Sequence, residues 1–167
     1  MTTPDCITTP RLSLSPLTLN DNHFIAALVN TEGWIKFIGN RNVHSIEDAN
    51  GYIQRILSNP KIKYWVAKLT DSNTAIGVVT FIKRDYLDAP DIGFAFLPEY
   101  GSCGYAYEAA HAVLQQLVQQ NNNSYILATT IPTNENSIKL LTKLGLRFDK
   151  VIEVETNTLH VYAIAIG

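Results

Sequence analysis

Apolar residues recur along the chain with two different spacings, and these spacings predict an order of strands and helices. Leucines alternate with polar residues through residues 11–17, which is the period of a half-buried strand. In residues 20–30 the apolar positions instead follow helical spacing behind a capping Asn20 or Asp21, which predicts a helix. The chain is therefore expected to open with a strand followed by a helix.

Two more helices are expected before the main sheet. A short one covers residues 31–39 and ends at Gly39, and a longer one covers residues 45–60, with Ser45 as its cap and its end before Pro60. Three runs rich in β-branched and aromatic residues follow, separated by turn residues, and predict an antiparallel meander. These runs are residues 63–69, 75–84 and 91–97.

The second half of the chain alternates helix and strand. A helix is expected after residue 104, with small and aliphatic residues on one face. That face holds Ala106, Ala109 or Ala110, Val113, Leu114, Leu117 and Val118. The last elements are a strand at 124–131, a helix at 136–145, and a hairpin of residues 147–156 and 158–166. Helices interleaved among mostly antiparallel strands predict one α+β domain over residues 1–167.

Composition limits the environment and the partners of this domain. The formal net charge of -2 argues against nucleic acid or an anionic membrane as a partner, because phosphate backbones are usually met by a basic excess. No window approaches the roughly 18 apolar residues of a membrane span, and the N-terminus does not have the pattern of a signal peptide. We expect a cytoplasmic protein, monomeric or homodimeric, in which any polyanion is held locally.

The cysteines and histidines of the chain do not have the spacing of a metal site. Cys6 and Cys103 form neither a CxxC pair nor a disulfide framework and are expected to be reduced. The histidines have no metal-ligand spacing. We therefore expect no metal.

Small residues gather in the stretch FLPEYGSCGYAYEAA, residues 96–110, where a strand should lead into a helix. Gly101 and Gly104 permit tight turning, so that consecutive N–H groups at the helix start can point outward together and bind phosphate. The stretch is neither a Walker motif nor a GxGxxG fingerprint. The simpler interpretation, that the two glycines only make a loop, stays open.

The stretch resembles the acyl-CoA-binding signature R/Q-x-x-G-x-G/A of the GNAT superfamily of N-acyltransferases. It is most similar to the branch of ribosomal-protein N-terminal acetyltransferases (RimJ/RimL-like), whose usual form is PEYWGKGYATEA. The six positions are Gly101, Ser102, Cys103, Gly104, Tyr105 and Ala106. Gly101 stands where Trp, Arg or Gln is usual, and Ser102 where Gly is usual. The resemblance implies that these residues bind the phosphates of acetyl-CoA, and that the backbone of Phe96 and Leu97 pairs with pantetheine.

A second segment, NENSIKLLTKLGLRF, resembles the family pattern N-x-x-S/A-x-x-L-x-x-x-G-F through Asn134, Ser137, Leu140 and Gly145. By this resemblance Asn134 contacts the pantetheine arm, whereas by its position it is a helix N-cap; both can hold. The resemblance covers about residues 9–166. It implies a seven-stranded sheet that splays between strands four and five, with CoA in the V.

Strand four offers a candidate general base. Alternation places Asp91 on the small-residue face with Gly93 and Ala95, and transfer to an amine needs a base because an ammonium has no lone pair. The alternatives are a turn role for Asp91, the nearby carboxylates Asp85, Asp88 and Glu99, and water.

A general acid is harder to identify. Many members of the superfamily have a tyrosine just after the position of Leu140 that protonates the leaving thiolate, and this chain has Leu141. Ser137 or water is then the candidate acid, and the alternative is that Ser137 touches the cofactor without chemistry. Cys103 at a helix start has no visible histidine partner for a covalent acyl-cysteine role.

The acceptor pocket is expected around the early helices. Residues 34–44 contribute Trp34, Phe37, Arg41 and His44, although an aromatic stripe is more often core than pocket. The combined prediction is an N-acetyltransferase that uses acetyl-CoA and an amine, either a protein N-terminus or a small molecule. A non-catalytic acyl-CoA-binding module and a purely structural interaction protein are the alternatives.

Overall fold

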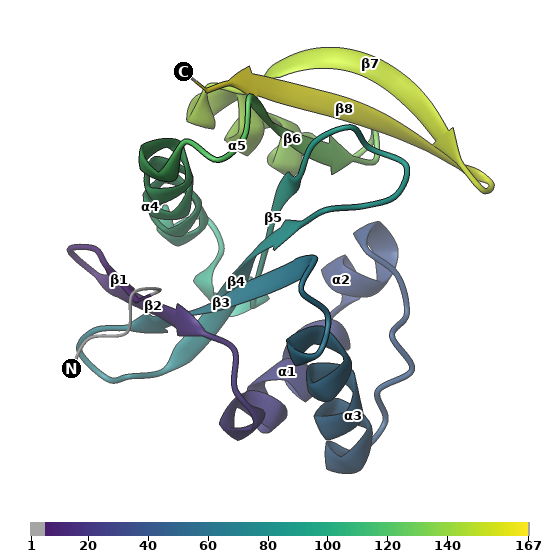
Figure 1. Ribbon diagram of the computed structural model, residues 1–167. Coiled ribbons are helices and arrows are strands. Elements are labelled where there is room, and N and C mark those ends of the chain that lie inside the picture. Colours follow the sequence, from purple (N-terminus) through teal and green to yellow (C-terminus); the bar gives the residue numbers. More distant parts are fainter. Residues whose placement is uncertain (1–5, 167) are drawn as a thin grey trace.

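Residues 6–166 of the computed structural model are described below, and they form one mixed sheet with helices on both faces (Figure 1). The sheet has eight strands in the order β1-β2-β3-β4-β5-β6-β8-β7. Their bounds are β1 Ile7–Thr8, β2 Leu12–Pro16, β3 Ile62–Leu69, β4 Ala75–Ile82, β5 Asp91–Phe96, β6 Tyr125–Thr130, β7 Arg147–Val154 and β8 Asn157–Ala165. The helices are η1 Leu19–Asp21, α1 Asn22–Val29, α2 Glu32–Phe37, α3 Ile46–Leu57, η2 Pro98–Tyr100, α4 Tyr105–Gln120 and α5 Glu135–Leu144.

The helix ends follow local capping chemistry. Ser45 precedes α3 and accepts a hydrogen bond from the N–H of Asp48, which satisfies one of the unpaired donors of the first turn. Gly145 ends α5 with a φ of 102°, a left-handed conformation that glycine adopts without a side-chain penalty. Both ends lie where the sequence pattern predicts them.

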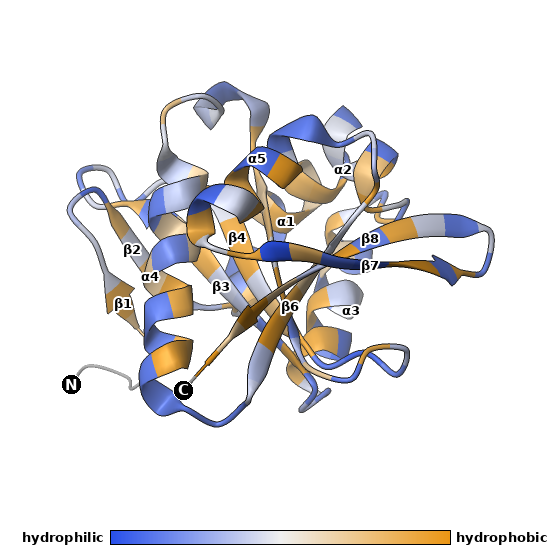
Figure 2. Cartoon of the chain, turned by 90° about the horizontal axis from the view of Figure 1, so that it is seen from above, coloured by the Kyte–Doolittle hydropathy of each residue, from blue (hydrophilic) through white to orange (hydrophobic). Residues whose placement is uncertain are grey.

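The two faces of the sheet carry separate hydrophobic cores. Helices α4 and α5 pack on one face, and α1, α2 and α3 pack on the other (Figure 1). The hydropathy of the residues explains this packing. In Figure 2, α4 carries alternating hydrophilic and hydrophobic bands, while the central strands are mostly hydrophobic. Both faces of the sheet are therefore covered by helices, and a ligand can reach the strands only at an edge or a gap between them.

Strands β5 and β6 are the only neighbouring parallel pair in the described sheet, and they pair over a very short distance. Their register consists of Asp91 opposite Leu127, supported by a bond of 2.9 Å from the N–H of Leu127 to the carbonyl of Pro90. Beyond this point the strands diverge (Figure 1). The expected α+β class and the splay between the strands are confirmed.

Two details differ from the prediction. The sheet has eight strands rather than seven, because the two-residue β1 pairs with β2 and is too short to leave an alternating pattern. Val118 is expected on the buried face of its helix but is 41% exposed, because it follows the buried Leu117 by one residue, which turns its side chain about 100° away around the helix. Ala109, Ala110, Val113, Leu114 and Leu117 are buried, as predicted.

Within residues 6–166, none of the helices has both the length and the apolar character that crossing a bilayer requires. The same part of the chain contains no group of three or more His, Cys, Asp or Glu side chains arranged to hold a metal ion.

Candidate functional site

The segment between β5 and α4 contains two residues in left-handed conformations. Ser102 has a φ of 63° and Gly104 a φ of 81°. Glycine adopts this conformation freely, whereas for serine it costs roughly 1–2 kcal/mol. The backbone at Ser102 is therefore held in a conformation that its own side chain disfavours.

This geometry leaves a row of backbone donors without protein partners. Gly101 donates to the carbonyl of Pro98, and Glu108 donates to the carbonyl of Gly104. Between them, the N–H groups of residues 102–107 donate to no acceptor among the described residues. Because α4 is 16 residues long, its dipole adds partial positive charge at the same end. The segment, hereafter the amide loop (residues 101–106), is suited to bind an anion such as phosphate.

A side-chain network supports the amide loop from the start of β2. The Nε of Arg11 lies 2.7 Å from Oε1 of Glu108, and the N–H of Arg11 donates to Oε2 at 3.0 Å. Thr9 donates from its hydroxyl to the same carboxylate. Nη1 of Arg11 donates to the carbonyl of Cys103 at 3.0 Å, and its guanidinium carbon lies 4.2 Å from the centre of the Tyr105 ring. The network joins segments 97 residues apart in sequence.

The charges in this network stabilise one another. Burial raises the pKa of the Glu108 carboxyl, but hydrogen bonds from Thr9 and Arg11 outweigh that effect and bring the pKa below its ordinary value. The sequence patterns identify neither Arg11 nor Glu108, because no spacing rule pairs residues so far apart. Cys103, which the sequence placed in the loop, is exposed and contributes its carbonyl rather than its thiol.

The predicted pantetheine residues lie at the end of β5. Phe96 and Leu97 are half-buried and directly precede η2 and the amide loop. The Phe96 ring packs over Gly77 on β4, where a Cβ would overlap it. The backbone of Leu97 is already used, because its N–H donates to the carbonyl of Ile76 on β4 and its carbonyl accepts from the N–H of Tyr100. Of the two predicted residues, only Phe96 has backbone groups left for another partner on the side of β5 that faces β6, so the predicted backbone pairing of Leu97 with pantetheine is wrong.

A second helix begins close to the same edge of the sheet. Because β5 and β6 are parallel, their carboxyl ends point to the same side, and each leads into a helix. Asn134 caps α5, since its Oδ1 accepts from the N–H of Ser137 at 3.2 Å. The expected N-cap role of Asn134 is confirmed, and the contact of Asn134 and Ser137 with a cofactor stays a prediction. Leu141 is 1% exposed and belongs to the core beneath α5.

Asp91 lies at the point where β5 and β6 still pair. Its side chain is 3% exposed, and its Oδ2 accepts from Nε of Arg84 at 2.7 Å. Burial raises the pKa of Asp91, and the guanidinium of Arg84 opposes this rise only in part. Burial lowers the pKa of Arg84, but the charge of Asp91 and the hydrogen bond to it outweigh this effect and leave the pKa of Arg84 raised. A role for Asp91 as a base is untested, and any such role must accommodate Arg84.

The predicted acceptor residues separate into core and surface. Trp34 is 4% exposed within the core that α1 and α3 form with the sheet, which matches the alternative interpretation given for the aromatic stripe. Phe37 is half-buried and His44 is exposed. The guanidinium carbon of Arg41 lies 6.0 Å from the centre of the Trp34 ring. Phe37 stays a predicted substrate contact.

Polar groups on the α1–α3 face of the sheet are a further feature that the sequence patterns miss. The hydroxyls of Tyr52 and Tyr64 lie 2.9 Å apart and are both buried. Burial, reinforced by Tyr52, raises the pKa of Tyr64 well above its ordinary value. In the register of the sheet, Tyr64 pairs with Thr80, and Thr80 pairs with Gly93 on β5. The buried hydroxyl groups thus extend to Thr80 on β4, which lies opposite Gly93 on the strand that precedes the amide loop.

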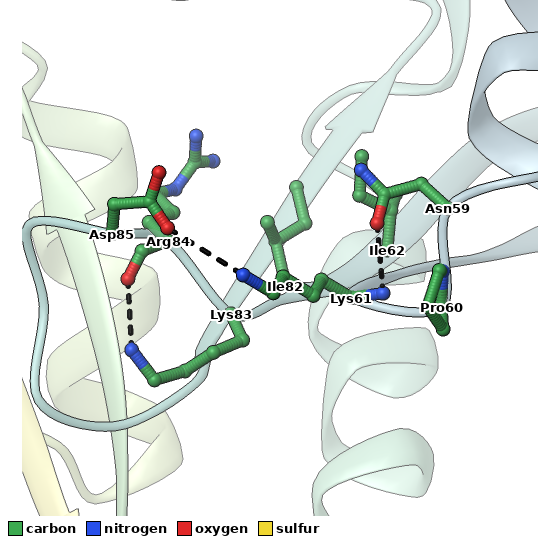
Figure 3. A pocket seen from close by; sticks show the side chains of 8 residues that line it. All are labelled: Asn59, Pro60, Lys61, Ile62, Ile82, Lys83, Arg84 and Asp85. Carbon is green, nitrogen blue, oxygen red and sulfur yellow. Dashed lines mark hydrogen bonds and ion pairs between the residues drawn. The ribbon is translucent and has the colours of Figure 1, made fainter.

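Two shallow surface pockets lie away from the amide loop. One, of about 370 Å³, is formed by the turn between α3 and β3 and the segment after β4 (Figure 3). Its cations already have partners, because Lys61 lies 3.6 Å from Asp85 and Lys83 donates to the carbonyls of Arg84 and Leu87. The other, of about 410 Å³, is lined by residues of α1 and the start of α3. Neither contains the unpartnered donors, so the amide loop is the better candidate site.

Comparison with known proteins agrees with this geometry. Residues 11–147 match the family model described as an acetyltransferase (GNAT) domain. A curated relative, the uncharacterized N-acetyltransferase YnaD of Bacillus subtilis, is 30% identical over 141 residues, which cover 84% of this chain and 82% of YnaD.

Solved structures share the fold. The GNAT-family acetyltransferase from Bacillus anthracis has a TM-score of 0.80 and 25% identity, covering 96% of this chain and 98% of its own. RimL, a ribosomal L7/L12 alpha-N-protein acetyltransferase solved in complex with coenzyme A, has a TM-score of 0.83 and 14% identity, covering 97% and 98%.

Proposed function

This chain belongs to the GNAT family of acetyltransferases, and on that basis we propose that it transfers an acetyl group from acetyl-CoA to a primary amine. The observation that carries the proposal is the row of unpartnered N–H groups in the amide loop, next to the diverging edges of β5 and β6. A phosphate and an extended amide-bearing arm fit these two features. CoA carries both in one molecule.

The donor is placed by backbone groups in this proposal. Residues 102–106 bind the pyrophosphate through their N–H groups, which need no basic side chain and so fit an acidic protein, while Gly101 gives the loop room to turn. Pantetheine lies along the free edge of β5 at Phe96, in the way a strand adds to a sheet edge. Asn134 and Ser137 at the start of α5 contact the arm from the side of β6.

The reaction is a direct attack within a ternary complex. The neutral amine nitrogen adds to the thioester carbonyl, backbone N–H groups stabilise the oxyanion that forms, and the CoA thiolate leaves as the amide is completed. One proton moves from the amine to a base, and one reaches the thiolate. Ser137 or water supplies the second, because Leu141, which stands in place of the tyrosine, has no acidic hydrogen.

Asp91 is the base in this proposal. Two features support it: its position at the vertex of the diverging strands, and a pKa that burial raises toward working pH, where a base is most effective. Arg84 occupies Oδ2, which leaves Oδ1 to take the proton, directly or through water. The acceptor is a protein N-terminus or a small amine, and the segment that contains Phe37 forms one side of its pocket.

A non-catalytic acyl-CoA-binding module is the second candidate. It is favoured by two specific observations, namely the absence of a side chain at Gly101 and the buried Leu141 in place of a tyrosine acid. Such a protein would bind CoA through the same amide loop without turnover.

Release of free thiol from acetyl-CoA in the presence of an amine panel tests the proposal. The panel contains peptides with free N-termini, polyamines and amino acids, and mass spectrometry identifies the acetylated product. Turnover with at least one amine is expected. CoA binding without turnover on any amine would favour the module, and absence of CoA binding would exclude both.

A further inference from the structure

We propose that Arg11 is a positioning residue of the donor site, a role that rests on the function proposed above. It holds the peptide between Cys103 and Gly104 in the orientation that turns the loop N–H groups toward phosphate. Arg11 directly precedes β2 and is not part of the amide loop itself. Its effect on CoA is therefore transmitted through the backbone.

The geometry of a trans peptide gives Arg11 this influence. In such a peptide the C=O and N–H bonds point in opposite directions, and none of the described peptides is cis. Nη1 of Arg11 holds the carbonyl of Cys103 at 3.0 Å. The N–H of Gly104 must therefore point away from Arg11, to the side where it meets no protein acceptor.

Arg11 also keeps a second donor free. In a helix extended toward its N-terminus, the N–H of Tyr107 would bind the carbonyl of Cys103, four residues earlier. Here that carbonyl accepts from Arg11, and Tyr107 donates to no acceptor among the described residues. The left-handed Gly104 ends the helix before it can close over the amide loop, and Arg11 holds the Cys103 carbonyl that a further turn would use.

Arg11 is itself fixed in place on three sides. Glu108 binds its Nε, Cys103 binds its Nη1, and its guanidinium plane lies over the Tyr105 ring. Because the Glu108 carboxylate neutralises the guanidinium, the pair offers phosphate little net charge. Its contribution is orientation, and this distinguishes it from a lysine or arginine that contacts the ligand directly.

This chain has a specific need for such support. At Gly101 it has no side chain where the family signature carries Arg or Gln, and at Ser102 the backbone is held at a disfavoured φ of 63°. A loop with these two properties relaxes unless another part of the molecule restrains it. The network from Thr9 and Arg11 to Glu108 provides that restraint from the edge of the sheet.

The test compares CoA with pantetheine, which has no phosphate, by titration calorimetry for CoA and ligand-observed NMR for pantetheine. Arg11→Ala should raise the Kd for CoA about tenfold or more and leave the Kd for pantetheine within twofold. Lys143→Ala is the matched control, because Lys143 also lies over a tyrosine of α4, Tyr107, at 4.2 Å. It should change neither Kd.

Two results would overturn the role of Arg11 while the proposed function stands: a CoA affinity of Arg11→Ala within twofold of wild type, or an equal loss for both ligands. If wild-type protein fails to bind CoA, the proposed function falls first. Where Arg11→Ala does not fold, Arg11→Gln keeps a donor for the Cys103 carbonyl but loses the charge pair, and a smaller loss for CoA alone is expected. Equal CoA binding by Arg11→Gln and wild type would also count against the role of the Glu108 pair.

Discussion

Individual residues of the amide loop each meet a backbone requirement. Gly104 has a φ of 81°, and a Cβ there would lie 3.4 Å from Nη2 of Arg11. Ser102 tolerates a similar conformation only at a cost. Because the loop binds through its backbone in the proposed function, changes in backbone preference should matter more here than changes in side-chain charge.

Gly104→Val should cripple donor binding and leave the fold largely intact. A β-branched residue is strongly disfavoured at the positive φ of residue 104, so the backbone should change conformation and the N–H row should lose its orientation. We expect a circular dichroism spectrum near that of wild type and a Kd for CoA raised about tenfold, or 1.4 kcal/mol. Unchanged affinity would place the phosphates elsewhere.

Asp91→Asn should lower kcat/KM by about 10²- to 10⁴-fold with little change in CoA affinity, because an amide cannot accept the proton of the amine. Raising the pH should partly rescue the variant, since more amine then arrives deprotonated. In wild type, activity should fall as the pH drops through the pKa of Asp91. Because burial raises this pKa, the fall should occur at a higher pH than for an ordinary aspartate.

The raised pKa of Asp91 affects stability and activity in opposite directions as the pH falls. A raised carboxyl pKa in the folded state favours folding at low pH, and this contribution is lost as pH rises through the folded pKa. Loss of activity in acid without loss of stability would therefore support protonation of Asp91 as the cause. Wild-type rates of Asp91→Asn across pH 6 to 9 would remove Asp91 from the mechanism.

At the scale of elements, sequence reasoning succeeded where local chemistry decides. The caps Ser45 and Gly145 were predicted because a side-chain oxygen or a left-handed glycine fixes a helix end within a few residues. The divergence of β5 from β6 has no such local signal and came only from family resemblance. The Arg11–Glu108 and Arg84–Asp91 pairs could not be predicted, because each depends on how separate elements pack.

Strand β5 depends on the missing side chain at Gly77. Gly77→Ala should displace the Phe96 ring, because the new Cβ would overlap it and Phe96 ends the strand just before the amide loop. Overpacking of this kind typically costs about 1–3 kcal/mol. We expect a lower Tm by thermal denaturation and a raised KM for acetyl-CoA. Gly33→Ala, at a position with open space around the new Cβ, is the control and should change the KM little.

In the whole molecule, the proposed donor site lies between two hydrophobic cores. One core lies under α4 and α5 and the other under α1 and α3, while the ladder between β5 and β6 has one registered pair. A ligand that adds to the free edge of β5 should stabilise the native state without adding to either core. Binding should therefore be visible in global stability.

CoA and acetyl-CoA should raise the Tm of the protein, because a ligand that binds only the native state stabilises it by mass action. At a concentration 100 times the Kd the gain is about 2.7 kcal/mol, which corresponds to roughly 5–10 °C for a domain of this size. Differential scanning fluorimetry with adenosine as the control measures it. No shift at millimolar CoA would contradict the donor assignment.

The 97-residue separation between Arg11 and Glu108 also sets an order of events during synthesis. Strands β1 to β5 leave the ribosome before α4 does, so the early meander can pair while its arginine has no carboxylate to meet. Contacts between distant segments form late because closing a long loop costs chain entropy. A nascent chain halted before residue 108 would thus contain strands β1 to β5 without the proposed donor site, and the donor could first be bound only after α4 has been made.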